Sequence, residues 1–265
     1  MRVRQPAVAG SFYPDDPDAL IHNIDAMLFE VDESVHRKSP KALIAPHAGY
    51  IYSGPTAASA YSLLEPEKVE RVVLLGPTHR VLLSGLALPD VDAFETPLGK
   101  IPLDQNAIRD IRGLSQVHIN NDSHALEHSL EVQLPFLQRR LNQFSLVPLA
   151  VGEATPEMVA EVINALWGGE ETVIIISSDL SHFHPYKTAQ RIDQNTVENI
   201  LNMEPSIGHE QACGATPING LLACLNSHPL TPELIDFRNS GDTAGPRDRV
   251  VGYTAIAFYE QESIE

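Results

Sequence analysis

Three histidines in this chain follow apolar runs, and their placement is the first indication of chemistry. His47 follows the run 42–45, His79 follows 71–76, and His182 follows 172–178. We expect these runs to be buried strands, whose carboxyl ends meet at the edge of an α/β sheet where ligands bind. One histidine alone is more often a hydrogen-bonded structural residue. Three at one edge predict a metal site, since neutral imidazole is the commonest metal-binding side chain.

Two further residues near these strand ends carry groups suited to such a site. Asp179 precedes His182 by three residues and could orient an imidazole, bind a metal itself or cap the next helix. Cys213 lies directly before a predicted helix amino terminus, where partial positive charge favours the thiolate that binds metals or attacks electrophiles. The structural alternative for a cysteine is a small buried hydrophobe. Cys224, which lies among leucines, fits that alternative better.

Residues 124–128 read H-x-x-E-H, a pattern used by one class of zinc peptidases. Helical spacing would place His124, Glu127, His128 and Glu131 on one face, opposite a stripe of leucines. An ordinary amphipathic helix keeps its solvated residues on that face, so the match is weak support for a peptidase. We retain Glu127 and His128 as residues that line a cleft. The chain has no G-x-S-x-G elbow, P-loop or Rossmann glycine pattern, so we expect no nucleotide cofactor.

The positions of these residues depend on a predicted series of alternating strands and helices. Capping residues predict helix starts after Asp16, Asp104, Thr155 and Thr216, and a further start at Gly54. Pro135 should kink or split a helix over 122–141, and residues 80–102 should form a hairpin or an edge addition. The other expected elements are strands over 145–151, 234–239 and 250–259, and a helix over 185–203. The fold class is therefore α/β, with a mixed, largely parallel central sheet flanked by helices.

Composition limits the remaining possibilities. The 265 residues, 43% of them hydrophobic, suffice for one large domain over 1–265, with two domains as the fallback. A net charge of -17 without a basic cluster excludes nucleic acid as an expected partner. We find no signal peptide and no run long enough to span a membrane, and only two cysteines are present. A cytoplasmic protein is therefore expected, with no membrane partner and no disulfide framework.

Several motifs together resemble the Memo-like proteins. They are QPAVAGSFYP, APHAGYIYSG, GPTH, EHSLEVQLPFL, SSDLSH, CGATPINGLL and NSGDTAG with VVGYTAIAF, and they follow one another along nearly the whole chain. The resemblance implies a fold similar to the catalytic subunits of class III extradiol dioxygenases. It places the metal ligands on His47, His79 and Cys213. It also puts His182 at the position of the dioxygenase acid–base histidine, with Asp179 beside it.

The resemblance implies a metal-dependent redox protein that holds Fe(II) or copper. A thiolate in place of the usual carboxylate ligand is softer and oxidisable, which favours copper or a thiolate-tolerant iron site. Family members are associated with copper and iron binding, with redox activity and, in animals, with phosphopeptide binding. The substrate would be a small molecule or a peptide, and the oligomeric state stays open.

Two alternative functions use the same residues. One is a non-catalytic peptide-binding or scaffold protein whose cleft offers Tyr50, Tyr52 and Phe183 as aromatic contacts. The other is zinc-dependent hydrolysis with Glu127 or Asp179 as the general base.

Overall fold

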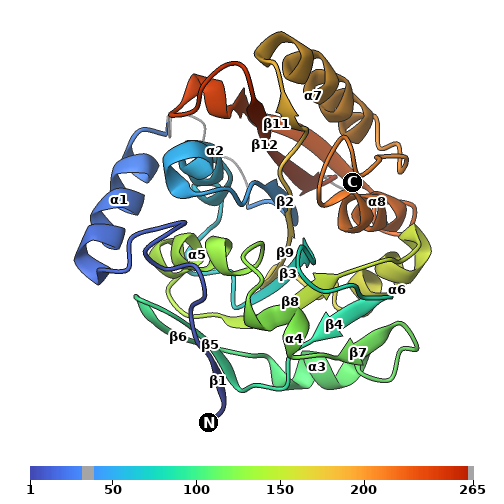
Figure 1. Ribbon diagram of the computed structural model, residues 1–265. Helices are drawn as coiled ribbons and strands as arrows, with labels where there is room; N and C mark the ends of the chain where they lie inside the picture. Colours follow the sequence, from blue (N-terminus) through green and yellow to red (C-terminus); the bar gives the residue numbers. More distant parts are fainter. Residues whose placement is uncertain (32–38, 262–265) are drawn as a thin grey trace.

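Four parallel strands form the centre of the sheet. The computed structural model describes residues 1–31 and 39–261. In spatial order the central strands are β2 (Ala42–Ala45), β9 (Thr172–Ser177), β3 (Arg71–Pro77) and β8 (Ser145–Val151) (Figure 1). Their nearly continuous apolar runs are buried on both faces, as parallel strands covered by helices require. Their carboxyl ends share one edge, as predicted.

Further strands extend the sheet on both sides and make it mixed, which confirms the predicted fold class. On one side β12 (Val250–Glu260) runs antiparallel to β2 and also pairs with β10 (His182–His184) and β11 (Leu230–Asn239). On the other side β4 (Leu86–Leu88) runs antiparallel to β8 and pairs with β7 (Val117–Ile119). The strand β10 thus pairs with β12 at the end of the sheet order, and it brings His182 to the edge where β9 ends.

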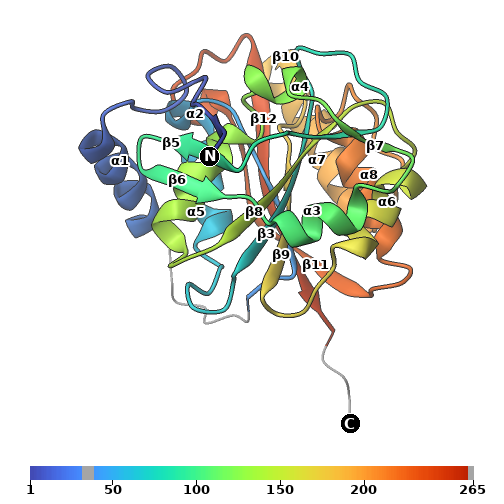
Figure 2. The ribbon, with the colours of Figure 1, turned by 90° about the horizontal axis from the view of Figure 1, so that it is seen from below.

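Residues 80–102 form both structures that the sequence predicts as alternatives. The strand β4 is the edge addition, and β5 (Ala93–Thr96) with β6 (Gly99–Pro102) is the hairpin. The hairpin of β5 and β6 (Figure 2) belongs to a separate three-stranded sheet, in which β1 (Val3–Arg4) pairs with β5 (Figure 1).

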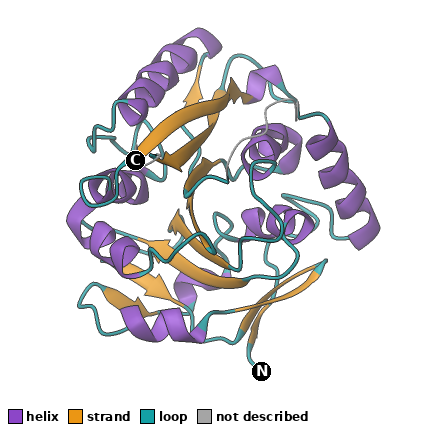
Figure 3. Ribbon diagram, turned by 180° about the vertical axis from the view of Figure 1, so that it is seen from behind, coloured by secondary structure: helices purple, strands orange, loops and turns teal. Residues whose placement is uncertain are grey.

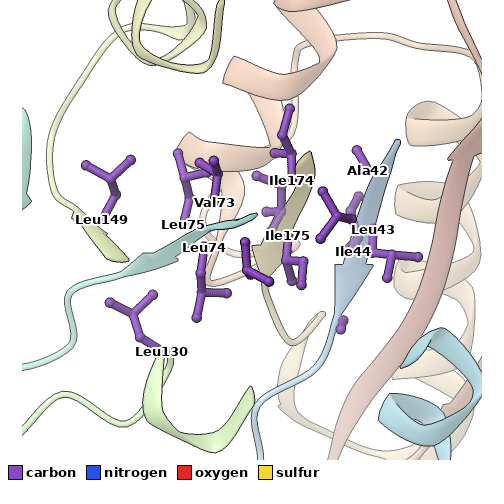
Figure 4. Packing of buried hydrophobic residues seen from close by; sticks show 14 of the residues in the cluster. Ala42, Leu43, Ile44, Val73, Leu74, Leu75, Leu130, Leu149, Ile174 and Ile175 are labelled. Atoms are coloured by element: carbon purple, nitrogen blue, oxygen red, sulfur yellow. The ribbon is translucent and has the colours of Figure 1, made fainter. Parts of the chain in front are cut away.

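Helices cover both faces of the main sheet (Figures 1 and 3). On one face lie α1 (Pro17–Phe29), α2 (Tyr50–Tyr61) and α5 (Leu134–Arg140), and on the other lie α6 (Pro156–Ala165), α7 (Tyr186–Leu201) and α8 (Ala215–Cys224). The short helix α3 (Gln105–Ile111) contacts α6. Between the layers, the side chains of Leu43, Leu74 and Ile175 are fully buried (Figure 4). No helix in the described part of the chain combines the length and the apolar character needed to cross a bilayer.

Three predicted helix caps are confirmed, and two predicted helix starts are wrong. The side chains of Asp16, Asp104 and Thr155 cap α1, α3 and α6. The helix α2 begins at Tyr50 rather than Gly54, because the carbonyl of Phe12 accepts the Tyr50 N–H at 2.8 Å and satisfies that helix end from outside. The helix α8 begins after Gly214, since the Thr216 hydroxyl lies 3.3 Å from the ring of His209 instead of capping.

Residues 122–141 do not form the single amphipathic helix that leucine spacing predicts. They fold as α4 (Asp122–Ala125), a loop, the 3₁₀ turn η1 (Glu131–Gln133) and α5, with Pro135 in the first turn of α5. The break falls at residues 126–130 instead of at Pro135, where the predicted kink or split is wrong, because a proline in the first turn of a helix interrupts no hydrogen bond. The predicted solvated face is wrong, because His124, Glu127 and Glu131 are buried.

Glu131 is buried because several donors converge on its carboxylate. Its two oxygens accept hydrogen bonds from the backbone N–H groups of Ala7 (2.8 Å) and Val8 (3.0 Å), from the Tyr13 hydroxyl (2.6 Å) and from Arg4. Arg4 also donates to the carbonyls of His124 and Glu127. This Arg4–Glu131 ion pair ties the amino-terminal segment to the loop that carries Glu127.

Replacing Glu131 should destabilise the protein strongly. Glu131→Ala leaves Arg4 and three other donors without their acceptor, so we expect a loss of about 3–5 kcal/mol in the free energy of unfolding. Glu131→Gln keeps the shape and should lose less. Asp90→Ala breaks the exposed Arg2–Asp90 pair and should change about 0–1 kcal/mol. Urea denaturation measures all three variants, and equal losses for Glu131→Ala and Asp90→Ala would contradict the role of Glu131.

Candidate metal centre

The imidazole of His47 is held with one nitrogen free. Its Nδ1 lies 2.8 Å from the hydroxyl of Ser177, and that hydroxyl donates its only hydrogen to the carbonyl of Ser129 at 2.6 Å. Ser177 must therefore accept a hydrogen bond from Nδ1–H, which leaves Nε2 of His47 unprotonated. Burial, with a smaller contribution from the neighbouring imidazoles, holds the pKa of His47 well below its usual value. His47 is thus a neutral imidazole with a lone pair available on Nε2.

Glu127 fixes the second histidine in the same way. Its carboxylate accepts hydrogen bonds from Nδ1 of His79 (2.8 Å), from the backbone N–H of His79 (2.6 Å), and from the N–H groups of His128 and Ser129 (both 2.9 Å). Burial opposes ionisation of this carboxyl, but the hydrogen bonds and the charge of His79 outweigh it and bring its pKa to about 2. Because the carboxylate accepts from Nδ1–H, Nε2 of His79 is the free nitrogen.

The third imidazole at this edge is His128. One ring nitrogen from each of His47, His79 and His128 lies within 4.8 Å of the other two. The rings of His79 and His128 stack with centroids 4.5 Å apart, and the ring of His47 stands nearly perpendicular to both. Burial and then the charge of His79 lower the pKa of His128 to about 4, so this imidazole is also neutral at pH 7. Sequence reasoning expected His128 to line a cleft and expected His182 as the third histidine.

These donors fit a transition-metal ion. Nitrogen ligands bind such ions at about 2.0–2.1 Å, which puts two ligand nitrogens on one ion roughly 3–4 Å apart. The ligand nitrogens of the three imidazoles, within 4.8 Å of one another, are close to that spacing. The lowered pKa values of His47 and His128 favour the neutral form that a metal ligand needs, and Ser177 and Glu127 orient the rings of His47 and His79. The site is partly open, because the side chains of His79 and His128 are 30% and 18% exposed.

Cys213 lies on the buried side of this cluster. Its Sγ is 3.3 Å from Nε2 of His47 and accepts the backbone N–H of Asp179 at 3.3 Å. A side chain at Gly214 would clash with Ser178, so glycine there lets the Cys213 loop approach the end of β9. The sequence predicted a thiolate at Cys213, and this prediction is wrong. Burial, and then the charge of Asp179, raise the pKa of Cys213 to about 12, so the thiol form is favoured. Together these two effects outweigh the hydrogen bonds from the backbone and from Ser178, which lower this pKa.

Asp179 and His182 lie beside the cluster. The Asp179 carboxylate is buried and accepts the backbone N–H of His47 at 2.8 Å, so it fixes the His47 loop rather than capping α7. Burial raises the pKa of Asp179, and a charge on His182 would act on both Asp179 and His47. His182 is therefore close enough for its charge to act on groups at the centre, although it does not belong to the three-imidazole cluster.

The H-x-x-E-H pattern does not form a zinc peptidase site. The helix ends at Leu126, between the two histidines, and Nε2 of His124 bonds the carbonyl of Ala87 at 2.9 Å. Of this pattern only Glu127 and His128 reach the centre. His124 is a buried structural residue whose pKa burial lowers to about 4.

Sequence reasoning missed the residues that support His47. Gln133 donates to the Ser177 hydroxyl at 2.8 Å and to the carbonyl of Pro46 at 2.9 Å, and it accepts from Tyr61 at 2.7 Å. The sequence does contain a pattern that could have identified them: Ser177 ends a mostly apolar strand, and Gln133 interrupts a leucine-rich stretch. Polar residues inside buried runs need partners, and here the partners lead to His47.

A buried carboxylate on α7 holds the segment that leads to His182. Asp193, 1% exposed, accepts the backbone N–H of Ser181 at 2.9 Å, and its other oxygen has no hydrogen-bond partner among residues 1–31 and 39–261. A side chain at Gly252 would collide with this carboxylate, so only glycine fits opposite Asp193. Gly252 also donates to the Ser181 carbonyl at 2.9 Å and accepts from Leu180 at 2.8 Å. Burial raises the pKa of Asp193 to about 6.

The raised pKa predicts a pH-dependent stability. The folded protein binds the Asp193 proton more tightly than the unfolded chain does, so this contribution is complete below pH 4 and is lost as the pH rises through about 6. Asp193→Asn should therefore raise the melting temperature more at pH 7 than at pH 4, by a few °C, since 1 kcal/mol shifts it roughly 2–4 °C. Thermal unfolding at both pH values tests this, with the exposed Asp248→Asn as control. The same change at both pH values would contradict it.

Comparisons with known proteins agree with this architecture. The family model described as Memo-like protein matches residues 4–257. A MEMO1 family protein of Aquifex aeolicus is 36% identical over 97% of this chain and 100% of its own length. A MEMO1 family protein of Methanosarcina barkeri is 37% identical over 96% of this chain and 99% of its own length.

A solved structure supports the fold alone. It is that of an uncharacterized protein from Escherichia coli K12, which covers 81% of this chain and 98% of its own length with a TM-score of 0.54 and 13% identity. Together, the family match over nearly the whole chain and the relatives at 36–37% identity establish that this chain belongs to the Memo-like protein family.

Proposed function

We propose that this chain is a metal-dependent redox protein that holds iron or copper at His47, His79 and Cys213, with His128 as a further donor. The convergence of three imidazoles, two of them oriented through hydrogen bonds at Nδ1, carries the proposal. The thiol of Cys213, 3.3 Å from Nε2 of His47, adds a soft donor that suits copper or iron better than a hard cation.

The residues around such an ion would have different roles. The ion would supply electron transfer and Lewis acidity when bound. Ser177 and Glu127 hold the imidazoles of His47 and His79 in the ligating tautomer. His182, at the rim, transfers protons to and from the substrate, while Asp179 fixes the His47 loop. The substrate is a small molecule or a peptide that enters past His79 and His128, the exposed members of the cluster.

Zinc-dependent hydrolysis is a second candidate, because three imidazoles form a donor set that catalytic zinc uses. Glu127 is poorly suited as the general base of that reaction, since four N–H groups already occupy its carboxylate. The peptide-binding alternative would use the same opening without turnover, and the aromatic side chains of Tyr52 and Phe183 are exposed for such contacts.

Metal binding to untagged protein tests the proposal directly. We expect Fe(II) or Cu(I), added without oxygen, to bind in a ratio near one, and His47→Ala to weaken binding by on the order of 100-fold or more, since even supporting residues are worth 10–100-fold. After oxidation, a thiolate-to-metal absorption band should vanish in Cys213→Ser and persist in Cys224→Ser. Equal metal binding by wild type and His47→Ala would rule the centre out. Zinc binding with hydrolysis, and no redox change, would favour the second candidate.

Glu127 should matter for affinity although it is not a ligand. Glu127→Ala removes the acceptor that orients Nδ1 of His79, so metal affinity should fall roughly 10–100-fold. Glu127→Gln retains an acceptor and should lose less. Calorimetric titration measures both variants, and Glu157→Ala, which changes an exposed glutamate in the first turn of α6, is the control. An unchanged affinity in Glu127→Ala would contradict this positioning role.

A further inference from the structure

The three imidazoles of the centre are held in different ways. The rings of His47 and His79 are oriented through Nδ1, by Ser177 and by Glu127 respectively, each at 2.8 Å. Nδ1 of His128 lies 3.3 Å from Oε1 of Glu127, but three N–H groups already donate to this oxygen, at 2.8, 2.9 and 2.9 Å. Because a carboxylate oxygen offers about two acceptor sites, none is left for the ring of His128.

Contacts with other rings hold His128 instead. In the part of the chain that the structure describes, neither nitrogen of this ring makes a hydrogen bond. The ring stacks on that of His79, with centroids 4.5 Å apart and 30° between the planes. The ring of Phe12 lies 4.7 Å from it, with 43° between the planes. No ring contact joins Phe12 to His79 within the described ranges, so the two pack against different parts of the His128 imidazole.

A tight turn fixes the position of the Phe12 ring. The N–H of Phe12 donates to the carbonyl of Val8 at 2.9 Å, and the N–H of Gly10 donates to the carbonyl of Tyr13 at 2.7 Å. Gly10 has a φ of 77°, which residues with a side chain rarely adopt. The carboxylate of Glu131 anchors the same turn, since it accepts the N–H of Val8 and the hydroxyl of Tyr13. The ring is therefore presented from a rigid support.

Phe12 is also bound to the segment that follows His47. Its carbonyl accepts the backbone N–H of Tyr50 at 2.8 Å, and this bond satisfies the amino-terminal end of α2. The backbone of Phe12 is thus fixed to the chain directly after the first imidazole, while its ring packs against the third. Movement of the turn is opposed from two sides, so the ring of His128 has a fixed neighbour.

We propose that Phe12 is a positioning residue of the metal centre, whose ring holds the imidazole of His128 against that of His79 and makes His128 the third histidine ligand. Without the ring of Phe12, the His128 imidazole turns toward solvent, to which 18% of its side chain is already exposed. The ion then keeps His47, His79 and Cys213. The ligand role of His128 rests on the proposed function, whereas its packing against Phe12 does not require an ion.

Proton NMR of protein loaded with Co(II) counts the ligating imidazoles, because the unpaired electrons of this ion shift the ring protons of its ligands far downfield. We expect signals from three imidazoles in the wild type and from two in His128→Ala. Phe12→Leu keeps an apolar side chain but removes the ring, so it should also give two. Its affinity for Co(II) should be about tenfold lower, since residues that orient a ligand are worth 10–100-fold. Phe12→Tyr keeps the ring and should restore the third set of signals.

Phe29→Leu is the matched control, because it makes the same change in a phenylalanine of α1 that is 90% exposed. It should change neither the signals nor the affinity. Circular dichroism checks that each variant is folded, and Phe12→Met, a second variant without the ring, replaces Phe12→Leu if the latter does not fold. Three sets of signals with unchanged affinity in the variants without the ring would overturn the proposal, as would His128→Ala that loses no signal.

Metal-free protein separates this proposal from the metal centre itself. Nuclear Overhauser contacts between the ring protons of His128 and His79 should be present in the wild type and in Phe12→Tyr, and they should be lost in Phe12→Leu. Loss of these contacts in a protein that binds no Co(II) would keep Phe12 as the residue that positions His128 and overturn the proposed function. Retained contacts in Phe12→Leu, with Co(II) bound as in the wild type, would keep the metal centre and overturn the role of Phe12.

Discussion

The centre depends above all on the buried carboxylate of Glu127. Four N–H groups from two separate chain segments converge on it, so one side chain joins the loop after β3 to the loop before η1. It thereby fixes the ring of His79 and the backbone of His128, whose rings stack. The Arg4–Glu131 ion pair supports the same loop from behind, since Arg4 also binds the carbonyl of Glu127. Two buried carboxylates, each of which accepts hydrogen bonds from several donors, thus connect the amino-terminal segment to the candidate site.

The parallel sheet provides the other half of the arrangement. The strand β2 delivers His47 and β9 delivers Ser177, and because these strands are direct neighbours the Ser177 hydroxyl reaches the His47 ring. Gln133 then links Ser177 to the carbonyl of Pro46. Every residue in this chain of hydrogen bonds comes from a strand end or from a segment packed on one, so the tautomer of His47 follows from the topology of the sheet.

The sequence predicted the parts of this site that depend on strand ends. Runs such as TVIIIS indicate buried parallel strands, and from them the shared edge that carries His47 and His79 follows. Leucine spacing over 122–141 was misleading, because it cannot reveal that Arg4, more than 100 residues away, stabilises a buried Glu131 and breaks the helical face. The protonation of Cys213 was equally hidden, since it depends on burial and on Asp179 rather than on the local helix end. The ligand roles of His47, His79 and Cys213 stay predictions.

The acids at the centre differ in how well they are compensated. Glu127 is ionised because four hydrogen bonds outweigh its burial, whereas burial raises the pKa of Asp179 and Cys213. The last two lie beside His47, whose imidazole is neutral for the same reason. A cation among the imidazoles would favour the ionised forms of both acids at once, since opposite charge nearby stabilises a carboxylate and a thiolate. The protein therefore has, next to the three imidazoles, two acidic groups that a bound metal ion would stabilise as anions.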